Sequence, residues 1–265
     1  MLRTDPKEVN IAKSQDFGKA RALSKARRVA RNKGIRYVVE EGFRRIQRRL
    51  SLSFWCNYYR FFKSRKTFTF QRNKYKYFYH KYNTTWRNER AVEIPIVWDI
   101  VKKNKGTVLE VGNVLSHYFT FQHDIVDKYE KEEGIINIDI VDIGPSKKYD
   151  LIVSISTMEH VGWDENPSDS KKILSENKKI INAIEKLKGL MNPYGKIVVT
   201  MPLGYNLDLD KFLRSGDLKF TKQFFLKRVS KDDRWVETEW KDLENVKFNS
   251  PFPFANGLII GVIEN

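Results

Sequence analysis

The sequence has almost no cysteine: Cys56 is the only one in 265 residues. A single thiol cannot build a disulfide framework or a multi-cysteine zinc site, and it is typical of a reducing compartment. No uninterrupted apolar run approaches the roughly 20 residues of a membrane span. The first residues also lack the apolar core of a secretory signal. These absences favour a cytoplasmic protein, and we expect no metal site.

Acidic residues are scarce in the first third of the chain. Residues 1–90 hold 25 Lys and Arg against 6 Asp and Glu, whereas the remainder holds 24 against 27. The net charge of +16 therefore belongs to the amino-terminal part. We expect those ninety residues to meet a polyanion or an anionic membrane surface.

Residues 34–63 combine basic and apolar side chains. A helical period of apolar residues over 34–50 lies opposite four arginines, and an aromatic cluster interleaved with Arg60 and Lys63 follows. This pattern suits a lipid headgroup interface, at the inner face of the membrane. The same segment could instead bind single-stranded nucleic acid by stacking and phosphate contacts. Alternatively, its helix could simply pack its apolar face on the main domain. Residues 1–33 are expected to be poorly ordered or marginally helical.

The next segment alternates aromatic and polar residues over 66–82. Its two-residue period predicts a β-hairpin with a turn at Arg72-Asn73-Lys74. A helix start is expected at 83–86, and a helix over 88–101 in which Pro95 is a candidate break. We divide the chain into a basic extension, 1–82, which ends with the hairpin, and a catalytic domain, 83–265.

From residue 106 onward, strand-like runs alternate with connections. We predict strands at 107–111, 123–127, 134–140, 149–156, 196–201 and 257–263, with candidates at 224–229 and 235–240, and a helix at 171–190. Such alternation indicates an α/β fold. We expect a Rossmann-like, mostly parallel, seven-stranded sheet with flanking helices and an antiparallel edge.

The first of these strands is the centre of the expected site. Residues 107–111 are apolar except for Glu110, which is typical of a strand buried on both faces. Gly112 follows, and a glycine lets the backbone turn sharply and approach a ligand closely. Ligands of open α/β sheets bind beyond the carboxyl ends of the strands. A nucleotide-type site is therefore predicted here.

Three motifs together carry a family resemblance. They are Leu109-Glu-Val-Gly112, Tyr149-Asp-Leu-Ile-Val153 with Met158-Glu-His-Val161, and Leu190-Met-Asn-Pro-Tyr-Gly-Lys196. In this order, over about residues 88–265, the chain resembles a class I S-adenosylmethionine-dependent methyltransferase, and we expect the glycan-modifying kind. It departs from the family at Val114 and Ser116, where further glycines are usual, and in the short stretch between Asp127 and Asp139. A Rossmann dehydrogenase would need a complete G-x-G-x-x-G motif, which is lacking.

The resemblance implies S-adenosylmethionine as cofactor and a set of binding residues. Gly112 and Asn113 would lie close to the methionine part of the cofactor. Glu110 would hold the loop or accept a hydrogen bond from the ammonium group of the cofactor. Asp127 would accept the ribose hydroxyls, and Asp139 would lie by the adenine amine. The alternative for each aspartate is a strand-end residue that satisfies backbone donors. Ser156, at the end of the strand 149–156, completes the predicted cofactor set.

Catalytic and acceptor residues are expected beyond the fourth and fifth strands. His160 is the candidate base for a hydroxyl acceptor, with Glu159 beside it, because a histidine can take up a proton near neutral pH. It could instead only cap its loop. The predicted acceptor-binding residues are Trp163, Asp164, Tyr205 and Asn206, with Tyr79 and His80 from the hairpin region. Arg90 and Glu93 are expected to reach the cofactor carboxylate, to close the site, or to form a plain ion pair.

Three functions remain open at this point. The first is methylation of a sugar or lipid-linked glycan hydroxyl at the cytoplasmic membrane face. The second is RNA methylation with residues 1–82 as a basic arm. The third is a binding module that kept the fold without the cofactor.

Overall fold

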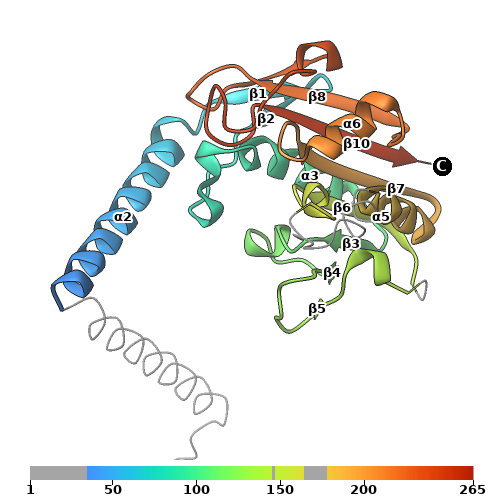
Figure 1. The fold of residues 1–265 in the computed structure, drawn as a ribbon, viewed down its shortest axis with the longest axis horizontal. Coiled ribbons are helices and arrows are strands. Elements are labelled where there is room, and N and C mark those ends of the chain that lie inside the picture. The colour runs from blue at the N-terminus through green and yellow to red at the C-terminus, as the bar shows by residue number, and fades with distance from the viewer. Residues whose placement is uncertain (1–34, 145–146, 164–177, 265) are drawn as a thin grey trace, which may run out of the picture. The chain divides into compact units, whose positions relative to one another are not determined.

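The computed structural model describes residues 35–144, 147–163 and 178–264. The chain divides into two compact units, Met1–Asn57 and Tyr58–Asn265 (Figure 1). The prediction for residues 1–33, the residue Asp164 and the first part of the helix expected at 171–190 lie outside the described residues.

One long helix, α2 (Ile35–Phe62), covers both the basic segment and the aromatic cluster. Within it, Arg36 and Arg44 pair with Glu40, and Arg45 pairs with Glu41, at 3.1 to 3.5 Å. Its large apolar side chains Val39, Phe43, Ile46 and Leu50 are each more than half exposed. Among the described residues, no helix has the length and apolarity that crossing a membrane requires.

The second unit contains the predicted α/β sheet. In the described residues its strands lie in the order β5-β4-β3-β6-β7-β10-β8-β9. Their bounds are β3 (Val108–Val111), β4 (Asp124–Val126), β5 (Ile135–Ile136), β6 (Tyr149–Ile155), β7 (Met191–Pro202), β8 (Lys222–Arg228), β9 (Trp235–Thr238) and β10 (Gly257–Glu264). The first five run parallel, and β10, β8 and β9 form the antiparallel edge. This is the expected Rossmann-like, mostly parallel sheet with an antiparallel edge, with eight strands rather than seven because both candidate strands, at 224–229 and 235–240, pair.

Both faces of the central strands are buried. On one face Leu109, Ile152 and Val199 join a core with helices α5 (Lys179–Gly189) and α6 (Leu207–Ser215). Alternate strand residues such as Leu151 and Val198 point to the other face, because side chains alternate along a strand. Helix α3 (Arg90–Lys103) packs against β6. These buried runs explain why the strands read as continuous apolar stretches.

The connection after β4 is shorter than a full helix, as the spacing of Asp127 and Asp139 indicated. The strand expected at 134–140 forms only at Ile135–Ile136, and a single 3-10 turn, η3 (Ile140–Asp142), follows it. Two further 3-10 turns border the site, η2 (Leu115–His117) after β3 and η4 (Met158–His160) after β6.

Pro95, the candidate break, does not interrupt helix α3. A proline inside a helix leaves the carbonyl four residues earlier without its usual donor. Here the carbonyl of Ala91 accepts a hydrogen bond from the backbone N–H of Phe78 at 2.9 Å. A neighbouring segment therefore replaces the missing helical bond, and the helix runs on to Lys103.

The predicted hairpin is present as β1 (Thr67–Phe70) and β2 (Asn73–Lys76). Its turn is Gln71-Arg72, two residues that both have positive φ, rather than residues 72–74. Positive φ at both positions gives the tight turn that matches strand twist. The hairpin packs on β9, where Glu237 Oε1 accepts from the Gln71 N–H at 2.8 Å. It thus lies within the compact unit 58–265, together with η1 (Tyr82–Arg87).

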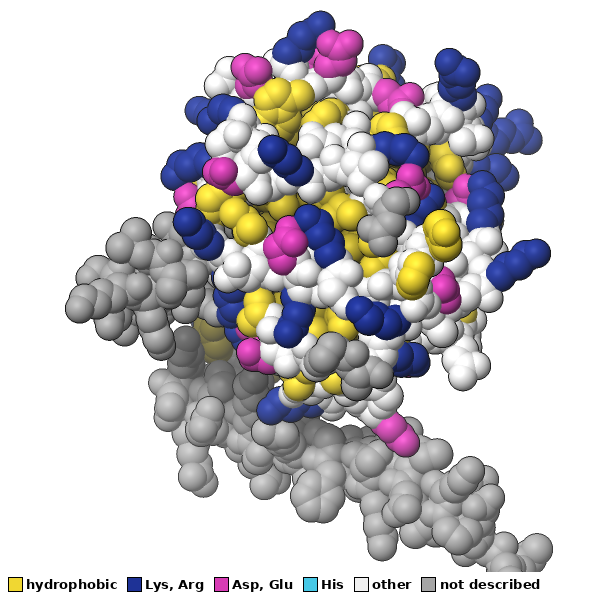
Figure 2. Space-filling view, turned by 90° about the vertical axis from the view of Figure 1, so that its right-hand side faces the viewer, with side chains coloured by type: hydrophobic (Ala, Val, Ile, Leu, Met, Phe, Trp, Pro, Cys, Tyr) yellow, Lys and Arg dark blue, Asp and Glu magenta, His cyan; other side chains and the backbone are white. Residues whose placement is uncertain are grey.

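Surface charge on the second unit is mixed. On the face shown in Figure 2, Lys and Arg side chains are spread out with Asp and Glu among them, and apolar side chains show between them.

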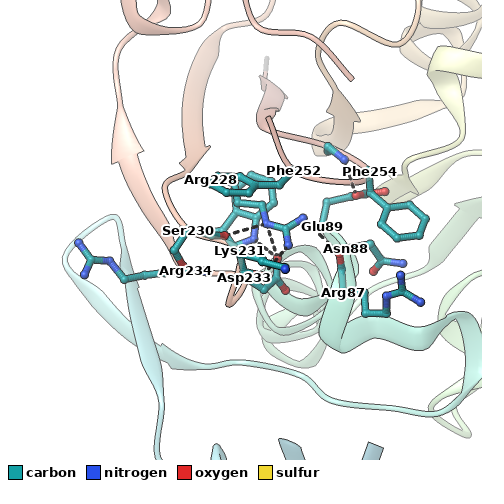
Figure 3. A network of polar contacts seen from close by, with 12 residues as sticks. Arg87, Asn88, Glu89, Arg228, Ser230, Lys231, Asp233, Arg234, Phe252 and Phe254 are labelled. Atoms are coloured by element: carbon teal, nitrogen blue, oxygen red, sulfur yellow. Dashed lines mark hydrogen bonds and ion pairs between the residues drawn. The ribbon is translucent and has the colours of Figure 1, made fainter. Parts of the chain in front are cut away.

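A buried polar network ties the sheet edge to the start of α3 (Figure 3). Arg228, at the end of β8, donates to the carbonyls of Arg87 and Pro253 at 3.2 and 2.7 Å and lies 3.3 Å from Asp233. Glu89 accepts from the Ala255 N–H at 3.2 Å. The Arg228 guanidinium donates hydrogen bonds to loop carbonyls, among them that of Arg87, just before α3. It therefore fixes the start of α3, the helix that contains Arg90 and Glu93. The last short turn, η5 (Trp240–Asp242), follows β9.

Candidate functional site

The loop after β3 is held by Glu110, whose side chain is fully buried. One carboxylate oxygen accepts from the backbone N–H groups of Val114 and Leu115 at 3.0 and 2.7 Å. The other lies 2.8 Å from Nε2 of His123. Of the two roles predicted for Glu110, these contacts correspond to holding the loop.

Gly112 is required where the sequence places it. Its φ is +82°, and a Cβ there would lie 2.2 Å from Oγ1 of Thr157. Its N–H donates to the carbonyl of Val126 at 2.8 Å. A side chain would therefore strain the backbone and collide with the segment that follows β6. The glycine keeps the ends of β3, β4 and β6 close together.

A hollow lies beyond these strand ends. Its empty volume is about 460 Å³, a figure that includes open solvent at its mouth. Gly112 and Asp127 both line it, with a mostly apolar wall that includes Ile138, Ile140 and Val161. The space that the sequence predicted between Gly112 and Asp127 is therefore present.

Asp127 follows β4 directly and is fixed by backbone donors. One carboxylate oxygen accepts from the N–H groups of Tyr129 and Glu130 at 2.8 Å each. The other accepts from the N–H of Asn113 at 3.1 Å. The strand-end alternative is thus realised, yet the carboxylate also lines the hollow. Its role as ribose acceptor stays a prediction, as does the approach of Asn113 to the methionine part.

Asp139 also lines the hollow, but two lysines surround it. Its carboxylate lies 2.7 Å from Nζ of Lys179 and 3.0 Å from Nζ of Lys128, and accepts from the Val141 N–H. Burial alone would raise the pKa of Asp139, but the two ammonium groups outweigh it and hold the pKa below its usual value. An adenine amine at this edge would share the carboxylate with both lysines.

Ser156 faces a buried polar layer. Its Oγ donates to Glu93 at 2.6 Å, and Arg90 donates to the carbonyls of Ile155 and Ser156 at 2.6 and 3.3 Å. Arg90 and Glu93 are themselves paired at 3.3 Å. Of the roles expected for Arg90 and Glu93, the structure shows a buried ion pair that fastens α3 to the end of β6.

His160 is at the mouth of the hollow. It lines the cavity, its side chain is 41% exposed, and its ring lies edge-on to Tyr205 with 4.9 Å between centroids. Trp163 is close in sequence and 37% exposed. Tyr205 also packs edge-on against Phe248. The structure therefore brings together His160, expected after the fourth strand, and Tyr205, expected after the fifth.

Glu159, predicted beside His160, is buried beneath it. The side chain is 1% exposed, Oε1 lies 3.6 Å from Nε2 of His160, and Oε2 has no hydrogen-bond partner among the described residues. Burial, with added repulsion from Glu93, raises the pKa of Glu159 well above its usual value. Burial therefore favours the protonated form of Glu159.

Three predicted acceptor residues have other surroundings. Asn206 is buried as the N-cap of α6: its Oδ1 accepts from the Asp208 and Leu209 N–H groups, and its Nδ2 donates to the Glu159 carbonyl at 2.8 Å. Tyr79 is buried in an aromatic cluster with Tyr59 and Tyr77. His80 stacks on Phe78 and lies edge-on to Tyr118, and its Nδ1 accepts a hydrogen bond from the Tyr82 N–H. None of the three lines the hollow.

Two residues that sequence reasoning missed complete the site. His123 anchors Glu110, and Thr157 defines the close approach to Gly112. No local pattern singles out either one, because each acts through a partner distant in sequence. In the described part of the chain, His, Cys, Asp and Glu form no group of three that could hold a metal ion.

Comparison with known proteins gives fold neighbours only. No protein-family model and no curated protein matches the chain. Among solved structures it is similar to the N-methyltransferase NodS from Bradyrhizobium japonicum with S-adenosyl-L-homocysteine (11% identity, TM-score 0.41, 67% of this chain and 87% of that one). It is also similar to TehB from Haemophilus influenzae (13%, 0.36, 70% and 64%) and to the glycopeptide N-methyltransferase MtfA (9%, 0.31, 64% and 88%). At such identities and scores the similarity bears on the fold alone.

Proposed function

We propose that the chain is an S-adenosylmethionine-dependent methyltransferase that acts on a hydroxyl of a sugar or lipid-linked glycan. One observation carries the proposal: Gly112 and Asp127 line one hollow at the strand ends, with His160 at its mouth. The position of Gly112, where no Cβ fits, and the carboxylate of Asp127 suit an adenosine-bearing cofactor. That cofactor, when bound, supplies an activated methyl group on a sulfonium.

The protein residues account for binding, orientation and proton removal. The apolar wall with Ile138 and Val161 suits an adenine ring, and Asp127 is fixed where it can accept two ribose hydroxyls. His160, half-exposed beside Tyr205, can take the proton of an acceptor hydroxyl. Aromatic side chains at this mouth, Tyr205 and Trp163, suit the apolar face of a sugar ring.

The acceptor class is tested with labelled methyl groups. Purified protein and radiolabelled S-adenosylmethionine are incubated with extracted glycolipid and, separately, with total RNA. We expect label in glycolipid. Label in RNA alone would overturn the acceptor assignment, and label in neither, without cofactor binding, would favour the cofactor-free module.

The proposal includes peripheral contact with an anionic membrane through α2. Val39, Phe43, Ile46 and Leu50 follow a spacing of four, three and four residues, so they share one helix face, and they are exposed. Such a face next to arginines suits the headgroup region. The protein should sediment with phosphatidylglycerol-containing vesicles and less with pure phosphatidylcholine. F43D/L50D should abolish sedimentation, and unchanged binding by this variant would contradict the assignment.

A further inference from the structure

A second, larger hollow lies between the hairpin and helix α3, away from the cofactor site. Its empty volume is about 900 Å³ with much of it open to solvent. Lys74 and Lys76 come from β2, Trp98 and Lys102 from α3, and Phe119 from the segment after η2. We call this hollow the hairpin groove. It shares no lining residue with the hollow at the strand ends.

The hairpin groove is cationic. Lys74, Lys76, Lys102 and Lys103 all line it and are exposed, and Asp99 is the single carboxylate among the described residues of the lining. Lys103 pairs with Asp99 at 2.7 Å. Within the described ranges, no ion pair occupies the other three ammonium groups. The groove thus concentrates positive charge, unlike the mixed face of Figure 2.

Aromatic rings form part of its wall. Trp98 and Phe119 stack face to face with centroids 3.9 Å apart and planes 4° apart, and Phe78 lies 5.6 Å from Phe119. Because these rings brace one another, the wall is preorganised. Flat apolar surfaces of this kind suit the carbon face of a sugar ring or a nucleobase.

Asp99 favours a sugar over a nucleobase as the ligand of this groove. Its Oδ2 accepts from the Tyr75 hydroxyl at 3.1 Å and from Lys103, while Oδ1 has no hydrogen bond among the described residues. A hydrogen bond from Lys103, with one from Tyr75, holds the pKa of Asp99 below its usual value despite partial burial. A charged carboxylate accepts hydrogen bonds from hydroxyl groups, which a saccharide presents around every ring, whereas a single-stranded nucleic acid presents few. Among the residues that the structure describes, the groove lining also contains no arginine, the side chain best suited to bidentate phosphate contacts.

We propose that the hairpin groove binds an acidic saccharide, with the lysines on its anionic groups, the aromatic wall on ring faces and Asp99 on hydroxyls. Naming this saccharide as part of the acceptor rests on the proposed function; binding itself does not. Helix α3 extends from the strand ends near the first hollow to the hairpin groove. Arg90 contacts the end of β6, and Asp99, nine residues later in the same helix, lines the groove. At 1.5 Å per residue that is about 13 Å along the helix axis, so an acceptor that fills both is longer than one sugar.

Binding measurements without cofactor test whether the hairpin groove binds an acidic saccharide, independently of any methyl transfer. Polygalacturonate oligomers, neutral dextran of equal length and poly(U) are titrated separately into the full-length protein in the absence of cofactor. We expect saturable, salt-sensitive binding of polygalacturonate, and at least about tenfold weaker binding of the other two. K74A/K76A/K102A should weaken polygalacturonate binding about tenfold, equivalent to about 1.4 kcal/mol.

The matched control is K178A/K219A/K231A, which removes the same charge from exposed lysines outside the groove. It should leave the affinity within about twofold. Equal losses in the two variants would overturn the groove and leave only a net-charge effect. D99N should weaken polygalacturonate but not poly(U), and tighter wild-type binding of poly(U) would assign the groove to nucleic acid instead. A protein that binds polygalacturonate but transfers no methyl group would overturn the proposed function and leave the groove standing.

Discussion

Glu110 and His123 are joined by a contact of 2.8 Å between Oε2 and Nε2, with both side chains almost entirely buried. The second nitrogen of His123 lies 3.2 Å from the carbonyl of Phe121. Because the other oxygen of Glu110 holds the loop after β3, this pair connects the start of β4 to the loop that shapes the site. The geometry of the loop after β3 thus depends on a residue 13 positions away from Glu110.

Loss of this pair should be costly. In E110Q one carboxylate oxygen becomes an NH2 group, so a single acceptor oxygen is left for both the His123 side chain and the loop N–H groups. We expect the free energy of unfolding to fall by about 3 kcal/mol, the range found when a buried pair is broken. Chemical denaturation measures it. The control E185Q breaks an exposed pair with Lys188 and should cost less than about 1 kcal/mol. Equal effects would show that Glu110 has no special role.

Comparing alanine substitutions at Gly112 and Gly134 separates the stability lost to backbone strain from the stability lost to a steric clash of the Cβ. Both have positive φ, +82° and +87°, but a Cβ at Gly134 meets nothing within 4 Å. G134A should lose about 1 kcal/mol from backbone strain alone. G112A should lose at least about 2 kcal/mol more, because its methyl group collides with Thr157. Thermal or urea unfolding compares them, and similar losses would refute the close approach.

His160 should govern turnover rather than stability. Removal of a general base typically slows a reaction by about 10²- to 10⁴-fold. We expect H160Q to lose kcat in that range, to keep cofactor affinity, and to unfold at nearly the wild-type temperature. H80Q is the control, since His80 lies off the hollow, and its kcat should stay within about twofold. If H160Q instead lowers the melting temperature and spares kcat, His160 only caps its loop.

The pH dependence of stability should report Glu159. Its pKa is raised in the folded state, so between about pH 4.5 and that raised pKa the folded protein holds a proton that the unfolded chain has released. The contribution of Glu159 to stability is therefore full at low pH and is lost as pH rises. E159Q mimics the protonated acid and should be less pH-sensitive than wild type. Denaturation from pH 5 to 9 tests this, and parallel curves would contradict it.

Much of the architecture follows from local sequence pattern. The buried strands, the antiparallel edge and the glycine after β3 are visible because burial on both faces demands continuous apolar runs. The hollow between Gly112 and Asp127 followed from the rule that strand ends form the crevice.

Features set by distant partners were not predictable. Helix α3 continues through Pro95 because the Phe78 N–H donates to the carbonyl that the proline leaves without a donor. Tyr79 is buried because Tyr59 and Tyr77 pack against it. Asn206 was expected to bind the acceptor, but it caps α6 instead, a role that only the bounds of the helix reveal. Sequence reasoning found the chemistry of these side chains but not their neighbours.

Titration of the purified protein with S-adenosylhomocysteine tests the central claim most directly. At 100 times the dissociation constant, a ligand of the folded state adds about 2.7 kcal/mol of stability, or roughly 5 to 10 °C in melting temperature for a domain of this size. We predict saturable binding with such a shift, kept in G134A and lost in G112A. No binding and no shift at millimolar ligand would contradict a cofactor site at the end of β3.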